Sequence, residues 1–422
     1  MPSYLFRNAS VLLRGERQPR RSMSVLVHHG TIAAVTNDAI DDLTAAIIDV
    51  RGKTLMPGLI DAHAHVTGLS LSPKNLTQPA SEIAIAAAHY LRSSLMSGFT
   101  TIREAGGADY VLARMLKEAE IIGPRLFYSG KALTQTGGGA DFRTPIEVTD
   151  PCGHVSPMSV MSVITDGIDE VRRAAREELR KGARQLKAFA SGGVVFPAEG
   201  NATRYEFSEP ELTAIVEEAA ARGTYVMAHA YTDESVRRCL SAGVRSIEHG
   251  NFVTRDTVAR MRDAGAFLDP TFISLVQRVE TAGEMRLSDE IVANLKRTIE
   301  RGKTVYSWAK ELQVPIALGT DLWGPEAQKS QIRELEIRAQ FDSADEILGS
   351  ATTVNAELLL QRGKLGVIAP GAHADLLIVD GDPLSDVRVL LDPERNLKLI
   401  MKDGVIYKND LTTALGQSES AA

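Results

Sequence analysis

Two histidines, His63 and His65, stand two positions apart at the end of the apolar run LMPGLIDAHAHVTG, residues 55–68. Residues i and i+2 of a strand face the same side, so both imidazoles would point in one direction. Converging neutral imidazoles suit a transition metal. A His-x-His pair also occurs by chance at an exposed strand end, so the rest of the chain has to decide between these two interpretations.

Four further residues at the ends of apolar runs favour the metal. They are Lys187, His229, His249 and Asp321. Four of the nine histidines thus end runs whose assignment as strands does not depend on histidine. A single such histidine usually belongs to a core, but four of them with an acid on the last run predict a cluster of metal ligands.

The runs that carry these residues alternate with amphipathic segments. The candidate strands are residues 59–65, 100–106, 125–130, 185–191, 224–230, 245–250, 266–272 and 315–321. The helical stretches between them, at 80–98, 167–183, 208–223 and 233–243, each end at or near a glycine, the usual helix stop. This alternation predicts an α/β fold, a (β/α)8 TIM barrel over residues 57–360. In such a barrel, catalytic groups lie at the carboxyl ends of the strands.

Both ends of the chain consist instead of short β-type runs broken by Gly, Asn and Asp. We expect residues 1–56 and 361–410 to pair into one small β-sandwich domain. The last residues, 411–422, are expected to form a flexible tail.

The composition excludes several classes of protein. The 422 residues are 44% hydrophobic and 24% charged, as in soluble globular proteins. A net charge of −7 and a pI near 5.8 argue against nucleic-acid or membrane partners. The sequence contains no apolar run long enough to span a bilayer and no recognisable signal peptide. With only Cys152 and Cys239, no disulfide framework is implied, and we expect a cytoplasmic protein. We also expect it to form a homo-oligomer.

One stretch, TQTGGGADFRTPIEVTDPCGHVSPMS at residues 134–159, is too long and too rich in Gly and Pro for a simple connector. We expect the segment from Leu133 to Met158 to cover the barrel mouth and to select the substrate. Arg143 and His154 lie within it and are candidate substrate-binding residues.

Seven motifs carry a family resemblance: MPGLIDAHAH, GFTTIREAGG, QLKAFASGG, VMAHAY, SIEHGN, LGTDLWG and GAHADLLIVDGDPL. Together they make the chain resemble the metal-dependent amidohydrolase superfamily, in its imidazolonepropionase-like and prolidase-like (Xaa-Pro dipeptidase type) branch. The resemblance runs from about residue 4 to residue 408. It is specific for the branch and much less so for the substrate.

The resemblance implies two divalent cations, usually zinc, about 3.5 Å apart. His63, His65 and Asp321 would hold the more buried metal, and His229 and His249 the more exposed one. Lys187 would bridge both as N6-carboxylysine. An ammonium group has three donors and no acceptor, so a plain lysine cannot be a ligand, whereas a carbamate offers anionic oxygens.

The implied reaction is hydrolysis of an amide C–N bond by metal-activated hydroxide. Asp321 would be the general base that accepts the proton and later passes it to the departing amine. Tyr231, two residues beyond His229, would donate its hydroxyl to the developing oxyanion. A rim aromatic without that role is the alternative for Tyr231.

The chain departs from the branch at TGGG, residues 136–139, where similar dipeptidases carry TGGH. Gly139 thus replaces a histidine that lines the substrate pocket, and this puts dipeptide substrates in doubt. Arg143 could supply a compensating guanidinium for a carboxylate, or it could be a solvated loop residue.

Four functions remain open from the sequence. The first is hydrolysis of dipeptides or N-acyl amino acids, such as Xaa-Pro substrates. The second is the same chemistry on a neutral amide, carbamate or phenylurea, which Gly139 favours. A non-catalytic scaffold is disfavoured because all six ligand positions are present. A nucleoside or cytosine deaminase is disfavoured by Lys187, since those enzymes usually use one metal without a bridging lysine.

Overall fold

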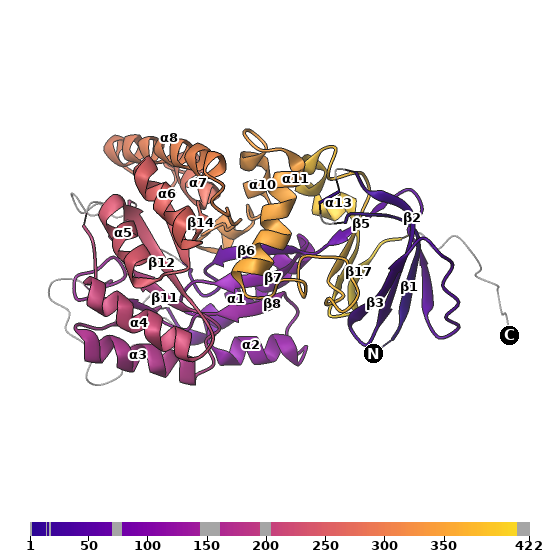
Figure 1. Cartoon of the computed structure of the whole chain (residues 1–422), viewed down its shortest axis with the longest axis horizontal. Coiled ribbons are helices and arrows are strands. Elements are labelled where there is room, and N and C mark those ends of the chain that lie inside the picture. Colours follow the sequence, from indigo (N-terminus) through magenta and orange to yellow (C-terminus); the bar gives the residue numbers. More distant parts are fainter. Residues whose placement is uncertain are drawn as a thin grey trace.

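The structure is a computed structural model that describes residues 2–13, 15–16, 18–69, 78–143, 161–194 and 204–411. His154, Cys152 and the expected tail from residue 412 onward lie outside the described residues. Figure 1 shows two regions side by side: a helix-rich region that encloses inner strands, and a β-sheet that contains the N-terminal strands.

The two ends of the chain share one sheet. Its strand order is β17-β16-β15-β5-β1-β2-β3, and β4 pairs with β1. Phe6, Val25 and Leu55 from the N-terminal segment pack in one core with Ile378 and Met401 from the C-terminal segment. The strands are β1 (Tyr4–Val11), β2 (Arg20–His28), β3 (Thr31–Thr36), β4 (Ala46–Asp49), β5 (Thr54–Pro57), β15 (Leu376–Val379), β16 (Leu397–Lys402) and β17 (Val405–Asn409).

The remaining strands form two parallel sheets. One has the order β6-β7-β8 and the other β10-β9-β11-β12-β13-β14. Strands buried on both faces read as continuous apolar runs, which is why these segments were recognisable in the sequence. Their bounds are β6 (Leu59–Ala64), β7 (Phe99–Glu104), β8 (Arg125–Tyr128), β9 (Ala132–Thr134), β10 (Ser162–Ile164), β11 (Leu186–Phe189), β12 (Val226–Thr232), β13 (Ser246–Phe252) and β14 (Phe267–Asp269).

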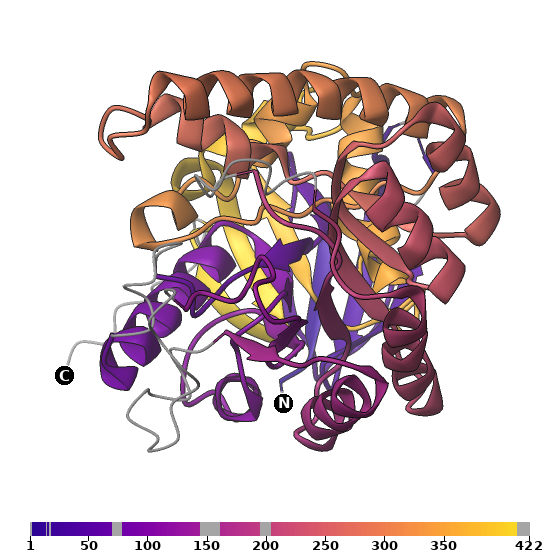
Figure 2. The ribbon, with the colours of Figure 1, turned by 90° about the vertical axis from the view of Figure 1, so that its left-hand side faces the viewer.

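Helices lie outside these parallel sheets, as Figures 1 and 2 show. The α-helices are α1 (Ala80–Met96), α2 (Tyr110–Lys117), α3 (Ile168–Arg180), α4 (Glu209–Ala221), α5 (Asp233–Ala242), α6 (Arg255–Ala264), α7 (Phe272–Glu280), α8 (Asp289–Glu311), α9 (Pro325–Gln328), α10 (Arg333–Arg338), α11 (Ala344–Gly349), α12 (Asn355–Leu358) and α13 (Pro393–Asn396). A π-helical turn spans Ser350–Val354 and a 3₁₀ helix spans Val387–Leu391. No helix among the described residues has both the length and the apolar character to cross a membrane.

The four predicted helices are present, and α5 illustrates why the glycine signal works. Gly243 follows it with a φ of 88°, in the left-handed region that a helix C-terminus favours. The alternation of apolar runs and amphipathic segments also correctly predicted seven of the eight expected strands. These are β6, β7, β8, β11, β12, β13 and a shorter β14.

The eighth expected strand, residues 315–321, is wrong as a regular strand. Only one parallel bridge, between Leu268 and Ile316, is formed there. Side chains satisfy part of its backbone: Leu318 N donates to Asn355 Oδ1 at 3.1 Å, and Thr320 N donates to Asp61 Oδ1 at 3.1 Å. Where amides bond side chains in this way, the regular ladder of a strand is interrupted.

Backbone hydrogen bonds also connect the edges of the two parallel sheets. Ala317 N donates to Leu268 O at 2.8 Å, and Ala62 N donates to Leu318 O at 2.8 Å, so residues 315–321 lie between β14 and β6. On the other side, Arg184 N, just before β11, donates to Tyr128 O on β8 at 2.9 Å.

Candidate metal centre

The carboxyl ends of the parallel strands converge on one cavity. All six expected ligands line it, although they are spread over more than 250 residues of sequence. The register explains part of this: Phe189 on β11 is opposite His229 on β12, and Ala230 is opposite His249 on β13. The lining residues are His63, His65, Gly139, Phe142, Lys187, Phe189, Gly193, Val194, His229, Tyr231, His249, Arg278, Asp321 and Trp323.

His63 is oriented by a buried carboxylate. Its Nδ1 lies 2.6 Å from Glu248 Oε2, and Arg103 Nη2 contacts both Glu248 oxygens at 3.0 Å. His63, Glu248 and Arg103 are all buried. A proton on Nδ1 donated to Glu248 leaves the lone pair on Nε2, which is the arrangement of a metal-ligating histidine with its carboxylate partner. This pair thus turns Nε2 of His63 towards the cavity.

His249 and His229 face one another. His249 Nε2 lies 3.0 Å from His229 Nδ1, while the opposite nitrogen of each ring contacts an oxygen. That oxygen is Thr271 Oγ1 for His249, at 2.8 Å, and Gly192 O for His229, at 3.4 Å. Two ring nitrogens aimed at one point are the donors that one cation requires.

Asp321 lies between the first two histidines and two further donors. Its Oδ1 is 3.3 Å from His65 Nε2 and 3.6 Å from His63 Nε2. Trp323 Nε1 donates to Oδ1 at 2.9 Å, and Ser274 Oγ donates to Oδ2 at 3.3 Å. Burial alone would raise the pKa of Asp321, but the hydrogen bond with His65 and the electrostatic effect of the neighbouring histidines together outweigh it and hold the pKa well below its usual value. Asp321 is therefore ionised at neutral pH.

Lys187 is fully buried on β11, and its Nζ lies 3.5 Å from His63 Nε2. It forms no ion pair with a carboxylate among the described residues. Burial lowers the pKa of Lys187 to about 8. A substantial fraction of this amine is therefore neutral and nucleophilic at mildly alkaline pH.

The donor set fits divalent cations. Burial lowers the pKa of every one of the four imidazoles, to about 4 for His63 and about 3 for His249. Neutral imidazoles are the form that binds metal. Nitrogen atoms of His63 and His249 and an oxygen of Asp321 all lie within 4.8 Å of one another. Nothing in this chemistry conflicts with bound cations.

The backbone is strained where the ligands are presented. His249 has a φ of 73°, Asp321 of 52° and the neighbouring Thr271 of 46°, all in the left-handed region. Such conformations cost about 1–3 kcal/mol each and persist where the surrounding structure holds them. Close approach matters too, because a Cβ on Gly319 would lie 2.3 Å from Asp269 Oδ2 and 2.6 Å from His63 Cβ.

Tyr231 lines the cavity beyond His229 and stacks on His249, with ring centroids 4.8 Å apart and an interplanar angle of 9°. Burial raises the pKa of Tyr231 far above its usual value. Its hydroxyl therefore keeps its proton and can act as a hydrogen-bond donor.

Of the three loop candidates, only Gly139 lines the cavity among the described residues. A Cβ there would lie 3.2 Å from Glu206 Oε1 and 3.3 Å from Ser191 O, so a larger residue needs its neighbours to move. Arg143 does not line the cavity, and its Nε and Nη2 donate to Asp141, both at 2.7 Å. His154 lies outside the described residues.

Several residues of the centre were not singled out from the sequence. Arg103 and Glu248 stand inside the quoted motifs GFTTIREAGG and SIEHGN, so a charged residue within an apolar strand was an available signal. Trp323 follows Asp321 by two positions. Arg278 lies on helix α7, and no local pattern distinguishes it from a surface arginine.

Comparison with known proteins agrees with the fold and the cavity described above. The sequence matches the Amidohydrolase family over residues 54–407. The ochratoxinase of Aspergillus niger is 31% identical over 421 residues, covering 95% of this chain and 86% of that protein. A prolidase whose crystal structure contains N-methylphosphonate-L-proline is 39% identical, with a TM-score of 0.91 over 96% of this chain and 100% of that one. A Xaa-Pro dipeptidase with methionine in its active site is 28% identical, with a TM-score of 0.83 over 96% and 100% of the two chains. The protein is thus an enzyme that hydrolyses C–N bonds, and its chain belongs to the amidohydrolase family.

Proposed function

We propose that the protein is a binuclear metal-dependent amidohydrolase that cleaves a dipeptide or an N-acyl amino acid. The observation that carries this proposal is the convergence of four neutral imidazoles, one carboxylate and one buried lysine on a single cavity. Neither a non-catalytic scaffold nor a deaminase that uses one metal accounts for all six.

His63, His65 and Asp321 would hold one cation, and His229 and His249 the other. Lys187, modified to N6-carboxylysine, would bridge them. When bound, zinc or a similar divalent cation supplies a Lewis acid that polarises the substrate carbonyl and lowers the pKa of water. The contacts of Asp321 Oδ1 with His65 and His63, at 3.3 and 3.6 Å, and of His249 with His229, at 3.0 Å, support this division of the ligands.

Asp321 accepts the proton of the attacking water and passes it to the departing amine. Trp323 and Ser274 each donate to one of its oxygens and fix the carboxylate plane. Tyr231 keeps its proton and donates a hydrogen bond to the oxygen that becomes negative in the transition state. Glu248 keeps His63 in the tautomer with its lone pair on Nε2.

The substrate class rests on the relatives. Two of the similar solved structures are named as a prolidase and a Xaa-Pro dipeptidase, and each aligns over nearly the whole chain. A neutral amide, carbamate or phenylurea is the second candidate. Gly139 favours it, because this position has no side chain that could contact a carboxylate.

Residues 315–321 complete, in our proposal, a closed eight-stranded barrel. The hydrogen bonds from Ala62 N to Leu318 O and from Arg184 N to Tyr128 O support closure on its two sides. The barrel would span residues 57–360, with segments 1–56 and 361–410 forming the small β domain. The cytoplasmic location and the homo-oligomer remain predictions.

The function is tested with protein produced with added zinc and bicarbonate. Metal analysis should approach two equivalents per chain. Lys187 should carry carbon dioxide, seen as added atoms on its side chain in a crystal structure or as added mass in native mass spectrometry. A panel of dipeptides, N-acyl amino acids, phenylureas and carbamates then identifies the substrate. One equivalent of metal with an unmodified Lys187 would remove the bridge, and activity confined to phenylureas or carbamates would favour the second candidate.

A further inference from the structure

A buried arginine in the cavity wall has a donor nitrogen without a partner. Arg278 lies on α7 and lines the cavity with Tyr231 and Asp321. It is 6% exposed, and its Nη1 has no hydrogen-bond partner in the part of the chain that the structure describes. Its other nitrogens are used: Nε donates to Ser274 O at 3.2 Å and Nη2 to Ser274 Oγ at 3.4 Å. One edge of the guanidinium is therefore anchored to its own helix.

Other buried arginines of this protein are neutralised. Arg103 Nη2 contacts Glu248 at 3.0 Å, and Arg338 Nε contacts Glu334 at 3.0 Å. Arg278 forms no such ion pair within the described ranges. Burying an unpaired charge and leaving a donor unsatisfied are both costly. An arginine held in this state next to reactive groups suggests that its partner is a ligand.

We propose that Arg278 binds the substrate's carboxylate on the side of the departing amine. The inference rests on the proposed function, since it identifies the chemical group that the same site recognises. A guanidinium presents paired N–H donors that match the two oxygens of a carboxylate. This makes Arg278 a specificity-determining residue.

The position of Arg278 suits a terminal α-carboxylate. Its Nη2 reaches Ser274 Oγ, which in turn donates to Asp321 Oδ2 at 3.3 Å, so two hydrogen bonds separate the guanidinium from the general base. In a dipeptide, one residue separates the scissile carbonyl from the terminal carboxylate. A base at the scissile bond and a partner for the carboxylate therefore have to line the same cavity, as Asp321 and Arg278 do.

Arg278 could also recognise a carboxylate in place of the pocket histidine that Gly139 replaces. A site with this arginine does not need a side chain at residue 139 to recognise a carboxylate. Arg143, the loop arginine considered first, already pairs with Asp141 at 2.7 Å and does not line the cavity.

The test compares alanyl-proline with alanyl-prolinamide on the wild type and on Arg278→Met, Arg278→Lys and Arg143→Ala. Methionine keeps the length and apolar stem of arginine without its charge, and Arg297→Met, on the exposed face of α8, is the matched control. Loss of a charge-assisted pair should raise the KM for alanyl-proline about 10- to 100-fold in Arg278→Met, with Arg278→Lys in between. The KM for the amide should change less than about twofold, and Arg297→Met should match the wild type.

Binding provides a second readout that does not require turnover. Calorimetry with N-methylphosphonate-L-proline should show an affinity for Arg278→Met lower by a similar factor. The proposal is overturned if Arg278→Met leaves the preference for the carboxylate unchanged, if Arg143→Ala removes that preference instead, or if the wild type accepts both substrates equally. In those outcomes the wild type still hydrolyses amides, so the proposed function stands. If the wild type cleaves neither substrate but binds the analogue through Arg278, the dipeptidase proposal fails and the role of Arg278 in binding a carboxylate stands. If the wild type neither cleaves the substrates nor binds the analogue, both proposals fail.

Discussion

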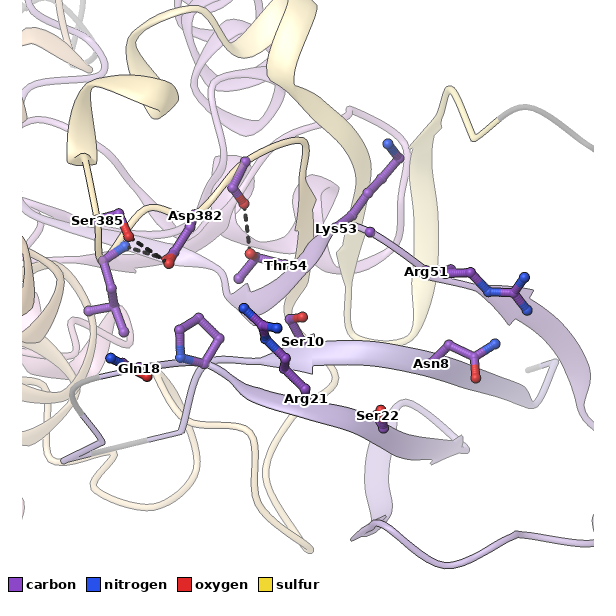
Figure 3. Close-up of a pocket in the computed structure, with 14 residues that line it drawn as sticks. Asn8, Ser10, Gln18, Arg21, Ser22, Arg51, Lys53, Thr54, Asp382 and Ser385 are labelled. Carbon is purple, nitrogen blue, oxygen red and sulfur yellow. Dashed lines mark hydrogen bonds between the residues drawn. The ribbon is translucent and has the colours of Figure 1, made fainter.

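Two hollows of this protein differ in both size and chemistry. A groove on the terminal β-sheet has a volume of about 930 Å³ and is lined by Arg21, Arg51 and Lys53 among other polar residues (Figure 3). The cavity at the ends of the parallel strands has a volume of only about 50 Å³. The larger volume does not mark the groove as the reactive region. Arg21 and Arg51 are exposed, and Lys53 and Arg51 pair with Asp380 and Asp49.

The difference is one of solvation. In the small cavity, His63, Lys187 and His249 have been taken out of water and their pKa values lowered, at a cost that the fold has to offset. Solvated charges on a groove impose no such cost and need no further explanation. Burial of titratable groups therefore identifies the reactive region better than the size of a hollow does.

Replacing the base should have the largest effect. Asp321→Asn keeps one oxygen ligand but removes the proton acceptor, so kcat should fall by about 10²- to 10⁴-fold while at least one metal is retained. Steady-state kinetics and metal analysis measure this. The same exchange in the groove, Asp382→Asn, should leave both unchanged. Turnover near the wild-type value in Asp321→Asn would mean that another group takes the proton.

The buried carboxylate behind His63 should come next. Glu248→Gln preserves shape but weakens its bond with His63 Nδ1, so zinc affinity should fall about 10- to 100-fold in a chelator competition. Glu326→Gln, on the surface, serves as the control. Because Arg103 loses the nearer of its two acidic partners, the melting temperature is recorded in parallel. An unchanged affinity would restrict Glu248 to neutralising Arg103.

A pH-dependent effect should arise at Glu206, which is 3% exposed and accepts a hydrogen bond from Thr134 Oγ1 at 3.1 Å. Burial raises the pKa of Glu206 from 4.5 to about 7. The native state therefore binds this proton more tightly than the unfolded chain, and the resulting stabilisation is lost as pH rises from about 4.5 through 7.

Glu206→Gln stays neutral and should escape that loss. Its free energy of unfolding should exceed that of the wild type increasingly as pH rises, by up to about 3 kcal/mol at pH 8, since one pKa unit corresponds to about 1.4 kcal/mol. Urea unfolding at pH 5 and pH 8 measures the difference, with Glu209→Gln as the control. An advantage that does not grow with pH would mean that Glu206 is not protonated in the native state.

The smallest effects should come from the groove. Arg21→Ala and Arg51→Ala remove exposed side chains, so stability should change by less than about 0.5 kcal/mol and kcat/KM should be unaltered. Thermal unfolding and kinetics on the identified substrate suffice. A clear loss of activity in either variant would break the contrast between the two hollows.

By itself, the sequence determined much of the architecture. Period-2 and buried apolar runs located β6, β11, β12 and β13, and glycines marked the ends of the helices between them. Four histidines and an aspartate, residue types that ligate metals, stand with Lys187 at the ends of those runs, and this placement predicted the six side chains that line one cavity. These are local signals, because side-chain direction and helix ends are set within a few residues.

Other features depend on contacts between distant segments, which form only when the chain folds. Residues 315–321 look like a strand, yet Asn355 and Asp61 take backbone bonds that a ladder would use. Arg278 resembles any helical arginine until α7 places it against the cavity, where its Nη1 has no hydrogen-bond partner among the described residues. Arg143 was equally eligible by composition, but Asp141 pairs with it. Which charge is left without a partner depends on burial and on neighbours brought together by folding, and neither can be read from residue spacing.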